Sequence, residues 1–141
     1  MTKHRTVLCF DFGKRRIGVA VGQDITGSAS PLGVIANRDS GVDHKRIEAL
    51  INEWRPDRLV VGLPLHADGT PSELTEHVMA FVEELQRYGL PTETVDERYT
   101  SIDAQRVLKD ARAGGTTRRV SKETIDSAAA VFIAERYLAS R

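Results

Sequence analysis

The chain has 141 residues, and its 20 Lys and Arg balance 20 Asp and Glu to give a formal net charge of zero. This length fits one domain, so we expect residues 1–141 to form a single domain. The zero charge argues against a polybasic protein that coats nucleic acid through bulk charge. The apolar runs fall far short of the ~20 residues of a membrane span. A single cysteine excludes an intramolecular disulfide and a cysteine-based zinc module. We therefore expect a cytoplasmic protein without a membrane partner.

The balanced total hides three charged segments. Residues 1–23 carry five bases and one acid (net +4), residues 68–97 carry eight acids and one base (net −7), and residues 103–122 carry six bases and two acids (net +4). Such alternation either brings opposite fields together in the fold or places charges on separate solvated faces.

Three short strands are predicted in the first third of the chain. Residues 6–12 form an apolar, partly β-branched run that ends at Gly13, and residues 17–22 form a second run after a basic turn. The short connection predicts that these two strands pair as a hairpin. A third strand is expected at about residues 30–35, and its Pro31 places it at a sheet edge.

Helical periodicity follows these strands. Four apolar residues have the spacing i, i+3, i+4 and i+7, which puts them on one side of a helix: Ile47, Leu50, Ile51 and Trp54. Pro56-Asp57 ends this helix, and residues 58–63 predict a buried strand.

A second helix is predicted to begin within Thr70-Pro71-Ser72-Glu73. Thr70 would be the N-cap residue, Pro71 the first helical residue and Glu73 the residue that closes a capping box. The apolar face of this helix continues until Tyr88-Gly89 ends it.

The remaining segments complete an α/β order. Residues 92–96 predict a strand, and two helices are expected at about residues 101–113 and 124–140. The resulting order, β-β-β-α-β-α-β-α-α, predicts a five-stranded mixed sheet, with three antiparallel strands followed by parallel ones and helices on both faces. This is the order of the ribonuclease-H-like fold, which nucleases, actin-like ATPases and inactive proteins share.

Three acidic residues are expected at one edge of this sheet, because ligands gather beyond the carboxyl ends of parallel strands. Asp11 lies in the first strand among apolar neighbours, and Glu97 directly follows the strand at 92–96. Asp126 lies near the start of the last helix, before three alanines that let this helix approach the sheet. Each acid also has a structural interpretation: a hydrogen-bonded Asp11, a solvated Glu97, and an Asp126 paired with Lys122.

Three carboxylates without a cysteine or a nearby histidine provide hard oxygen ligands, which suit Mg²⁺ or Mn²⁺ rather than zinc. Two such ions about 4 Å apart activate a water molecule and stabilise the leaving oxygen of a phosphodiester. The pattern therefore indicates a hydrolase that uses two metal ions, bound by Asp11, Glu97 and Asp126.

Ordered motifs along the chain make the interpretation more specific. The first runs from Asp11-Phe12-Gly13 through Arg16-Ile17-Gly18-Val19-Ala20. It is followed by Pro31-Leu32, Val60 to Leu65 with Asp68-Gly69, Asp96 to Ser101 with Ala104, and Lys122 with Asp126 to Ala129. Over nearly the whole chain these motifs resemble the YqgF/RuvX family of Holliday-junction-resolvase-like proteins and pre-16S rRNA nucleases. The resemblance implies a ribonuclease-H-like fold and a metal-dependent nuclease whose acids match Asp11, Glu97 and Asp126.

Asp96 is an alternative to Glu97 as the metal-binding acid at the end of the strand at 92–96. Adjacent strand residues face opposite sides, so only one of the two points toward the site. The family pattern favours Glu97, with Asp96 facing the other layer.

Basic residues near the acids are candidates for binding phosphates on either side of the scissile bond. Such contacts position a nucleic-acid strand without recognising its base sequence. Lys122 either contacts the scissile phosphate or neutralises Asp126. The segment 114–119 either grips substrate or forms an exposed connector. The predicted substrate-binding residues are Arg16, Arg98, Lys122, Lys14, Arg118 and Arg119.

The resemblance implies cleavage of RNA, with processing of the 5′ end of pre-16S rRNA and a ribosome association as the expected context. Cleavage of Holliday junctions, branched DNA or single-stranded DNA in repair is the first alternative. A nucleic-acid- or ribosome-binding factor without turnover is the second. A junction resolvase would need a dimer, so a monomer and a homodimer both stay open.

Overall fold

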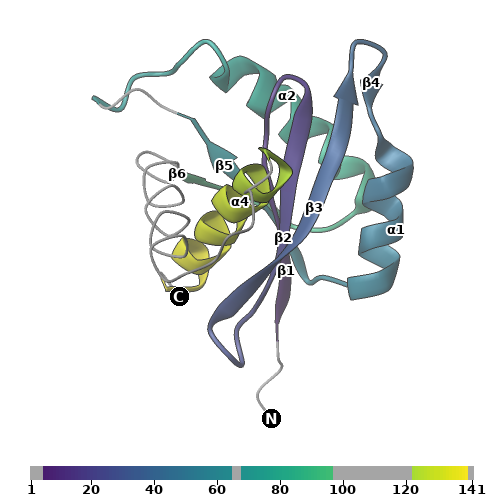
Figure 1. The fold of residues 1–141 in the computed structure, drawn as a ribbon, viewed down its shortest axis with the longest axis vertical. Coiled ribbons are helices and arrows are strands. Elements are labelled where there is room, and N and C mark those ends of the chain that lie inside the picture. The colour runs from purple at the N-terminus through teal and green to yellow at the C-terminus, as the bar shows by residue number, and fades with distance from the viewer. Residues whose placement is uncertain (1–4, 65–67, 97–121, 140–141) are drawn as a thin grey trace.

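The computed structural model describes residues 5–64, 68–96 and 122–139, apart from the side chains of residues 122–127. The predicted helix at 101–113 lies outside the described residues. The described elements follow the predicted order of three strands and then alternating helices and strands, except that a short fourth strand follows the third (Figure 1). They are β1 (Thr6–Asp11), β2 (Arg16–Gln23), β3 (Ser28–Arg38), β4 (Gly41–Val42), α1 (His44–Trp54), β5 (Arg58–Leu63), α2 (Thr75–Leu85), the 3₁₀ helix η1 (Gln86–Tyr88), β6 (Thr92–Asp96) and α4 (Lys122–Ala139).

The strands form one mixed sheet in the order β4-β3-β2-β1-β5-β6. β1 pairs antiparallel with β2 and parallel with β5, and β5 pairs parallel with β6, so the predicted mixed topology is confirmed. The sheet has six strands rather than the five predicted. The additional strand, β4, arises because Gly41 adopts a φ of 124°, which turns the chain back onto the end of β3. Because β4 pairs only with Asn37 and Arg38, Pro31 of β3 still lies along an edge within the described sheet.

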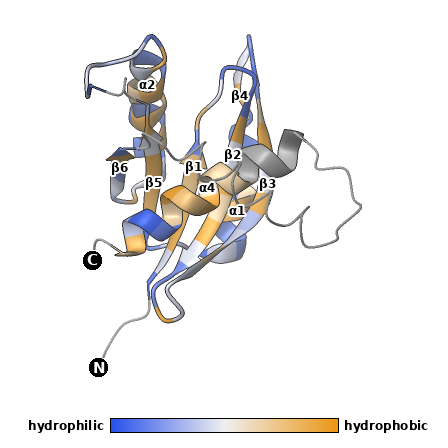
Figure 2. Ribbon diagram, turned by 60° about the vertical axis from the view of Figure 1, so that its left-hand side comes forward, coloured by the Kyte–Doolittle hydropathy of each residue, from blue (hydrophilic) through white to orange (hydrophobic). Residues whose placement is uncertain are grey.

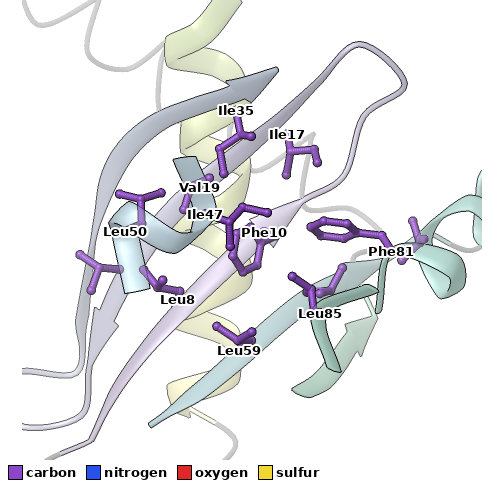
Figure 3. Packing of buried hydrophobic residues seen from close by; sticks show 13 residues of the cluster. Leu8, Phe10, Ile17, Val19, Ile35, Ile47, Leu50, Leu59, Phe81 and Leu85 are labelled. Carbon is purple, nitrogen blue, oxygen red and sulfur yellow. The ribbon is translucent and has the colours of Figure 1, made fainter. Parts of the chain in front are cut away.

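Helices cover both faces of the sheet, and the alternation of side chains along β1 supplies each face with its own core (Figures 1 and 3). Leu8 and Phe10 pack into the larger cluster, with residues of α1 and α2. Val7 and Cys9 face α4 in the smaller cluster. Burial raises the pKa of the Cys9 thiol, so this cysteine is an apolar core residue, as its position in the strand suggests. Figure 2 shows apolar residues along the central strands β1 and β5.

Small residues let α4 lie close to the sheet. A Cβ atom on Gly22 of β2 would come within 3.1 Å of a Val7 methyl carbon, and within 3.3 Å of side-chain carbons of Ala134 and Leu138. On the helix, Ala129 and Ala130 are buried as well. The predicted close approach of the last helix is thus confirmed, and Gly22 on β2 contributes to it together with the alanines on the helix.

The second helix begins at Thr75, five residues after the predicted N-cap, so that prediction is wrong. Thr70 is instead held in a turn by Asp68, whose Oδ1 accepts hydrogen bonds from the Thr70 amide at 2.9 Å and from its hydroxyl at 2.6 Å. The Ser72 and Thr75 hydroxyls both donate to the Pro64 carbonyl, at 3.1 and 2.6 Å. The start of the helix is therefore fixed by hydrogen bonds to the residue that follows β5. The spacing of residues within 70–73 does not reveal these bonds.

Candidate active site

Asp11 is the last residue of β1, half-buried and on the face of the sheet that α4 covers, in line with Val7 and Cys9. Its partner on β2 is Gly18. On the other side Phe10 pairs with Val61, so the next residue of β5, Gly62, lies beside Asp11. Neither neighbour carries a side chain. The sheet thus leaves space on both sides of this carboxylate, which fits the requirement of a divalent cation for several oxygen ligands.

The carboxyl ends of β1, β5 and β6 lie at one edge of the sheet because these strands are parallel. On β6, Glu93 contacts Tyr137 of α4, and Val95 packs against the smaller core cluster. Asp96 has the opposite parity along the strand. Asp96 therefore does not share the α4 face with Val95. Glu97 itself lies outside the described residues.

A hydrogen-bonded cluster at the opposite end of the strands fixes α4 against the sheet. The Arg58 guanidinium at the start of β5 donates to Glu93 Oε2 at 2.8 Å and to the Tyr137 hydroxyl oxygen at 3.1 Å. The Tyr137 hydroxyl in turn donates to Glu93. Burial and the Glu93 hydrogen bond raise the pKa of Tyr137. The cluster joins β5, β6 and α4, and sequence reasoning missed it because its three members are 35 to 79 residues apart.

The connection between β1 and β2 carries the predicted basic residues. Lys14 is exposed, and Arg16 is the half-buried first residue of β2. A Cβ atom on Gly13 would come within 2.4 Å of the Arg16 carbonyl oxygen, so this turn requires glycine. Asn37 of β3, which the sequence did not single out, donates from its side-chain amide to the Gly13 carbonyl at 2.7 Å.

Of the predicted site, the structure thus describes Asp11, Lys14 and Arg16 together at one edge. Lys122 and Asp126 lie in the first two turns of α4, but their side chains are outside the described residues. Glu97, Arg98, Arg118 and Arg119 also lie outside them. Accordingly, the described part of the chain contains no group of three histidine, cysteine or acidic side chains that could hold a metal ion.

A cavity of about 570 Å³ lies away from this edge, near the start of β1 and the C-terminal end of α4. Arg5, Arg58 and Arg136 line it together with Asp24 and Glu135, so charges of both signs surround it. Its apolar wall comes from Val7, Phe132, Leu138 and other residues of α4. The cavity does not include Asp11. Among the described helices, none is long and apolar enough to cross a membrane.

The fold is that of ribonuclease-H-like nucleases of the resolvase type. Thermus thermophilus RuvC in complex with a Holliday junction substrate superposes with a TM-score of 0.60 at 13% identity, over 97% of this chain and 95% of that chain. A fowlpox virus resolvase in complex with Holliday junction DNA superposes with a TM-score of 0.55 at 10% identity, over 96% of this chain and 97% of that chain. At these identities the likeness establishes the fold alone.

Sequence comparison then identifies the family. A family model described as "RuvX: Holliday junction resolvase" matches residues 5–140. An Azotobacter vinelandii protein named "Putative pre-16S rRNA nuclease" is 46% identical over 143 aligned residues, which cover all of this chain and 98% of that protein. A Burkholderia lata protein of the same name is 46% identical over 94% of this chain and 88% of that protein. The chain belongs to the RuvX family, which confirms the resemblance seen in its motifs.

Proposed function

We propose that this chain, as a single domain, is a metal-dependent nuclease that hydrolyses phosphodiester bonds of RNA in the cytoplasm, in the 5′-end processing of pre-16S rRNA. The observation that carries the proposal is Asp11, a half-buried carboxylate at the carboxyl edge of the parallel strands with glycine on both neighbouring strands. The names of the curated relatives favour RNA as the substrate.

Glu97 and Asp126 would complete the set of metal ligands. The parity of β6 supports Glu97, because Glu93 and Val95 face α4 and residue 97 continues that series. Helical spacing supports Asp126, since it precedes Ala130, Ile133 and Tyr137 by four, seven and eleven residues. Those three residues are buried on the side of α4 that faces the sheet. All three acids would therefore converge on one face of the sheet.

Bound Mg²⁺ or Mn²⁺ ions would activate water and stabilise the leaving oxygen. In this mechanism Asp11 would hold both ions from the centre of the sheet, with Glu97 and Asp126 on either side. The basic residues would position the substrate, with Arg16 and Lys14 binding phosphates beside Asp11. Arg98, Lys122, Arg118 and Arg119 are proposed to bind phosphates as well. Such hydrolysis leaves 3′-hydroxyl and 5′-phosphate ends.

The assignment of Glu97 can be tested against its neighbour. Glu97→Gln should lower the cleavage rate at least about 100-fold, since even indirect partners of metal ligands contribute about 10–100-fold. Asp96→Asn should change it less than about threefold, because position 96 has the opposite parity. Initial rates at saturating Mn²⁺ measure both effects. If Asp96→Asn lowered the cleavage rate more than Glu97→Gln did, Asp96 rather than Glu97 would be the metal ligand.

The substrate class is tested with the wild-type protein and three labelled substrates: a precursor rRNA fragment, single-stranded DNA and a four-way DNA junction. We expect cleavage of the RNA in Mn²⁺ or Mg²⁺ and none in EDTA. Faster cleavage of the junction would favour the resolvase alternative, which the family description and the junction-bound structural neighbours support. A resolvase would also need a homodimer, whereas RNA processing needs only a monomer. Binding of RNA or ribosomes without cleavage in any metal would contradict the nuclease proposal.

A further inference from the structure

Two turns lie side by side at the edge of the sheet that carries Asp11. The β1–β2 turn presents Lys14 and Arg15, and the β3–β4 turn presents Arg38; all three side chains are exposed. We call these three residues the basic edge. Figure 1 shows both turns projecting beyond the same end of the sheet. Within the described part of the chain, none of the three side chains enters an ion pair.

Asn37 holds the two turns together. Its side-chain amide donates to the Gly13 carbonyl at 2.7 Å, and its backbone amide donates to the Arg15 carbonyl at 2.9 Å. It also pairs with Val42 of β4, so it links β4 with the β1–β2 turn. One half-buried residue thus fixes the backbone on which Lys14, Arg15 and Arg38 are displayed.

The position of Arg38 extends the proposed substrate site. Asp11 lies on β1, Arg16 begins β2, and Arg38 ends β3, so these residues step outward across three neighbouring strands. The β3 residue level with Asp11, through Gly18, is Val34, and Arg38 lies four residues further along β3. With about 4.8 Å between strands and about 3.3 Å per residue, Arg38 lies about 10 Å to the side of Asp11 and about 13 Å beyond it along the strand. If the scissile phosphate of an RNA strand lies at Asp11, the flanking phosphates of that RNA would therefore lie over the basic edge.

Two acids besides Asp11 lie near this edge. The Asp43 carboxylate faces the first turn of α1, where it accepts a hydrogen bond from the Arg46 amide. Asp39 is exposed next to Arg38. Lys14, Arg15 and Arg38 together with Asp39 carry a net charge of +2. Removal of Asp39 should therefore strengthen the binding of a polyanion, the opposite of the effect of removing Arg38.

We propose that Lys14, Arg15 and Arg38 form one phosphate-binding edge that carries the substrate strand away from Asp11, and that Asn37 is the residue that positions it. The inference rests on the proposed function, since it assigns the path of the nucleic acid over that site. It adds Arg38 as a binding residue and Asn37 as a positioning residue.

The test measures binding separately from cleavage. A fluorescent single-stranded RNA is titrated with protein in EDTA, where metal-dependent cleavage stops, and anisotropy gives Kd at several salt concentrations. Arg38→Ala should weaken binding several-fold and make the slope of log K against log salt shallower by about 0.7, the loss expected for one phosphate contact to a single strand. Asp39→Asn should strengthen binding. Arg87→Ala, an exposed arginine in η1 before β6, is the control with the same loss of charge.

For Asn37, both Asn37→Ala and Asn37→Asp should raise Kd and KM while kcat at saturating substrate stays the same. The aspartate retains the shape of the side chain but brings a carboxylate against the Gly13 carbonyl. Asn52→Ala, an exposed change in α1, is the matched control. If Arg38→Ala and Asp39→Asn bind as the Arg87→Ala control does, the inference is overturned, even if cleavage is confirmed. If the wild type binds RNA but cleaves nothing, the proposed function fails while an effect of Arg38 would still stand.

Discussion

Asp11→Asn should abolish metal-dependent cleavage, with a fall in rate of at least about 100-fold, while the protein stays folded. Asparagine has the shape of aspartate and retains one oxygen, but it lacks the negative charge that attracts a divalent cation. Asp11 lies between Gly18 and Gly62 on the neighbouring strands, so no side chain on either strand can replace the lost carboxylate at that place. Rates with labelled RNA in Mn²⁺ measure the loss.

A thermal readout separates loss of metal binding from loss of structure. Metal that binds only the folded state stabilises it, by about 2.7 kcal/mol at a concentration of 100 times Kd. Mn²⁺ should therefore raise the Tm of the wild type, and this shift should vanish in Asp11→Asn. Asp24→Asn is the control, because that exposed carboxylate accepts a hydrogen bond from the Arg5 amide, which asparagine can also accept. Normal cleavage by Asp11→Asn would contradict the proposed role of this residue.

Phe81→Ala should cause the largest loss of stability, about 3–5 kcal/mol, which is a large fraction of the 5–15 kcal/mol that stabilises a typical domain. Phe81 of α2 is fully buried. Its ring packs edge-on against Phe10, with ring centroids 5.6 Å apart (Figure 3). Its centroid also lies 5.3 Å from that of the Phe12 ring. Truncation would remove both aromatic contacts and leave a cavity between α2 and the sheet.

Urea denaturation and thermal melting check this prediction, and we expect Tm to fall by about 10 °C or more. Met79→Ala is the matched control on the same helix, because that side chain is 47% exposed and should cost little. A small effect of Phe81→Ala would mean that α2 contributes little to the core. The change should also lower activity by way of Phe12, which directly follows Asp11 in the chain.

Two parallel strands were predictable because their limits are local, whereas β4 was missed and β3 is longer than the predicted 30–35. The predicted strands at 58–63 and 92–96 coincide with β5 and β6. A Pro-Asp pair precedes the first strand, and a proline precedes the second. Apolar or alternating residues fill the strands themselves. Asp11 was predictable as an acid within an apolar run, and the structure makes it the last residue of β1, one residue before the predicted end of that strand. Local patterns of this kind depend on residues that are neighbours in sequence.

Features that depend on distant residues were not predictable. The start of α2 is set by hydroxyl groups that donate to Pro64, 8 and 11 residues earlier in the chain. The amide of Asn37 looks unremarkable in sequence, yet its partner Gly13 is 24 residues away. The fold brings β5, β6 and α4 together, and only this places Arg58 in contact with Glu93 and Tyr137. No single segment of the sequence carries such information.

The packing of α4 on the face beneath Asp11 also has a consequence for shortened forms of the protein. Val7 and Cys9 belong to β1, whereas α4, which covers them, is the last described helix and ends at Ala139. A fragment that stops before α4 would therefore expose this apolar face and, on the proposed assignment, would lack Asp126. The burial of this face and the proposed cleavage would thus depend on the same helix.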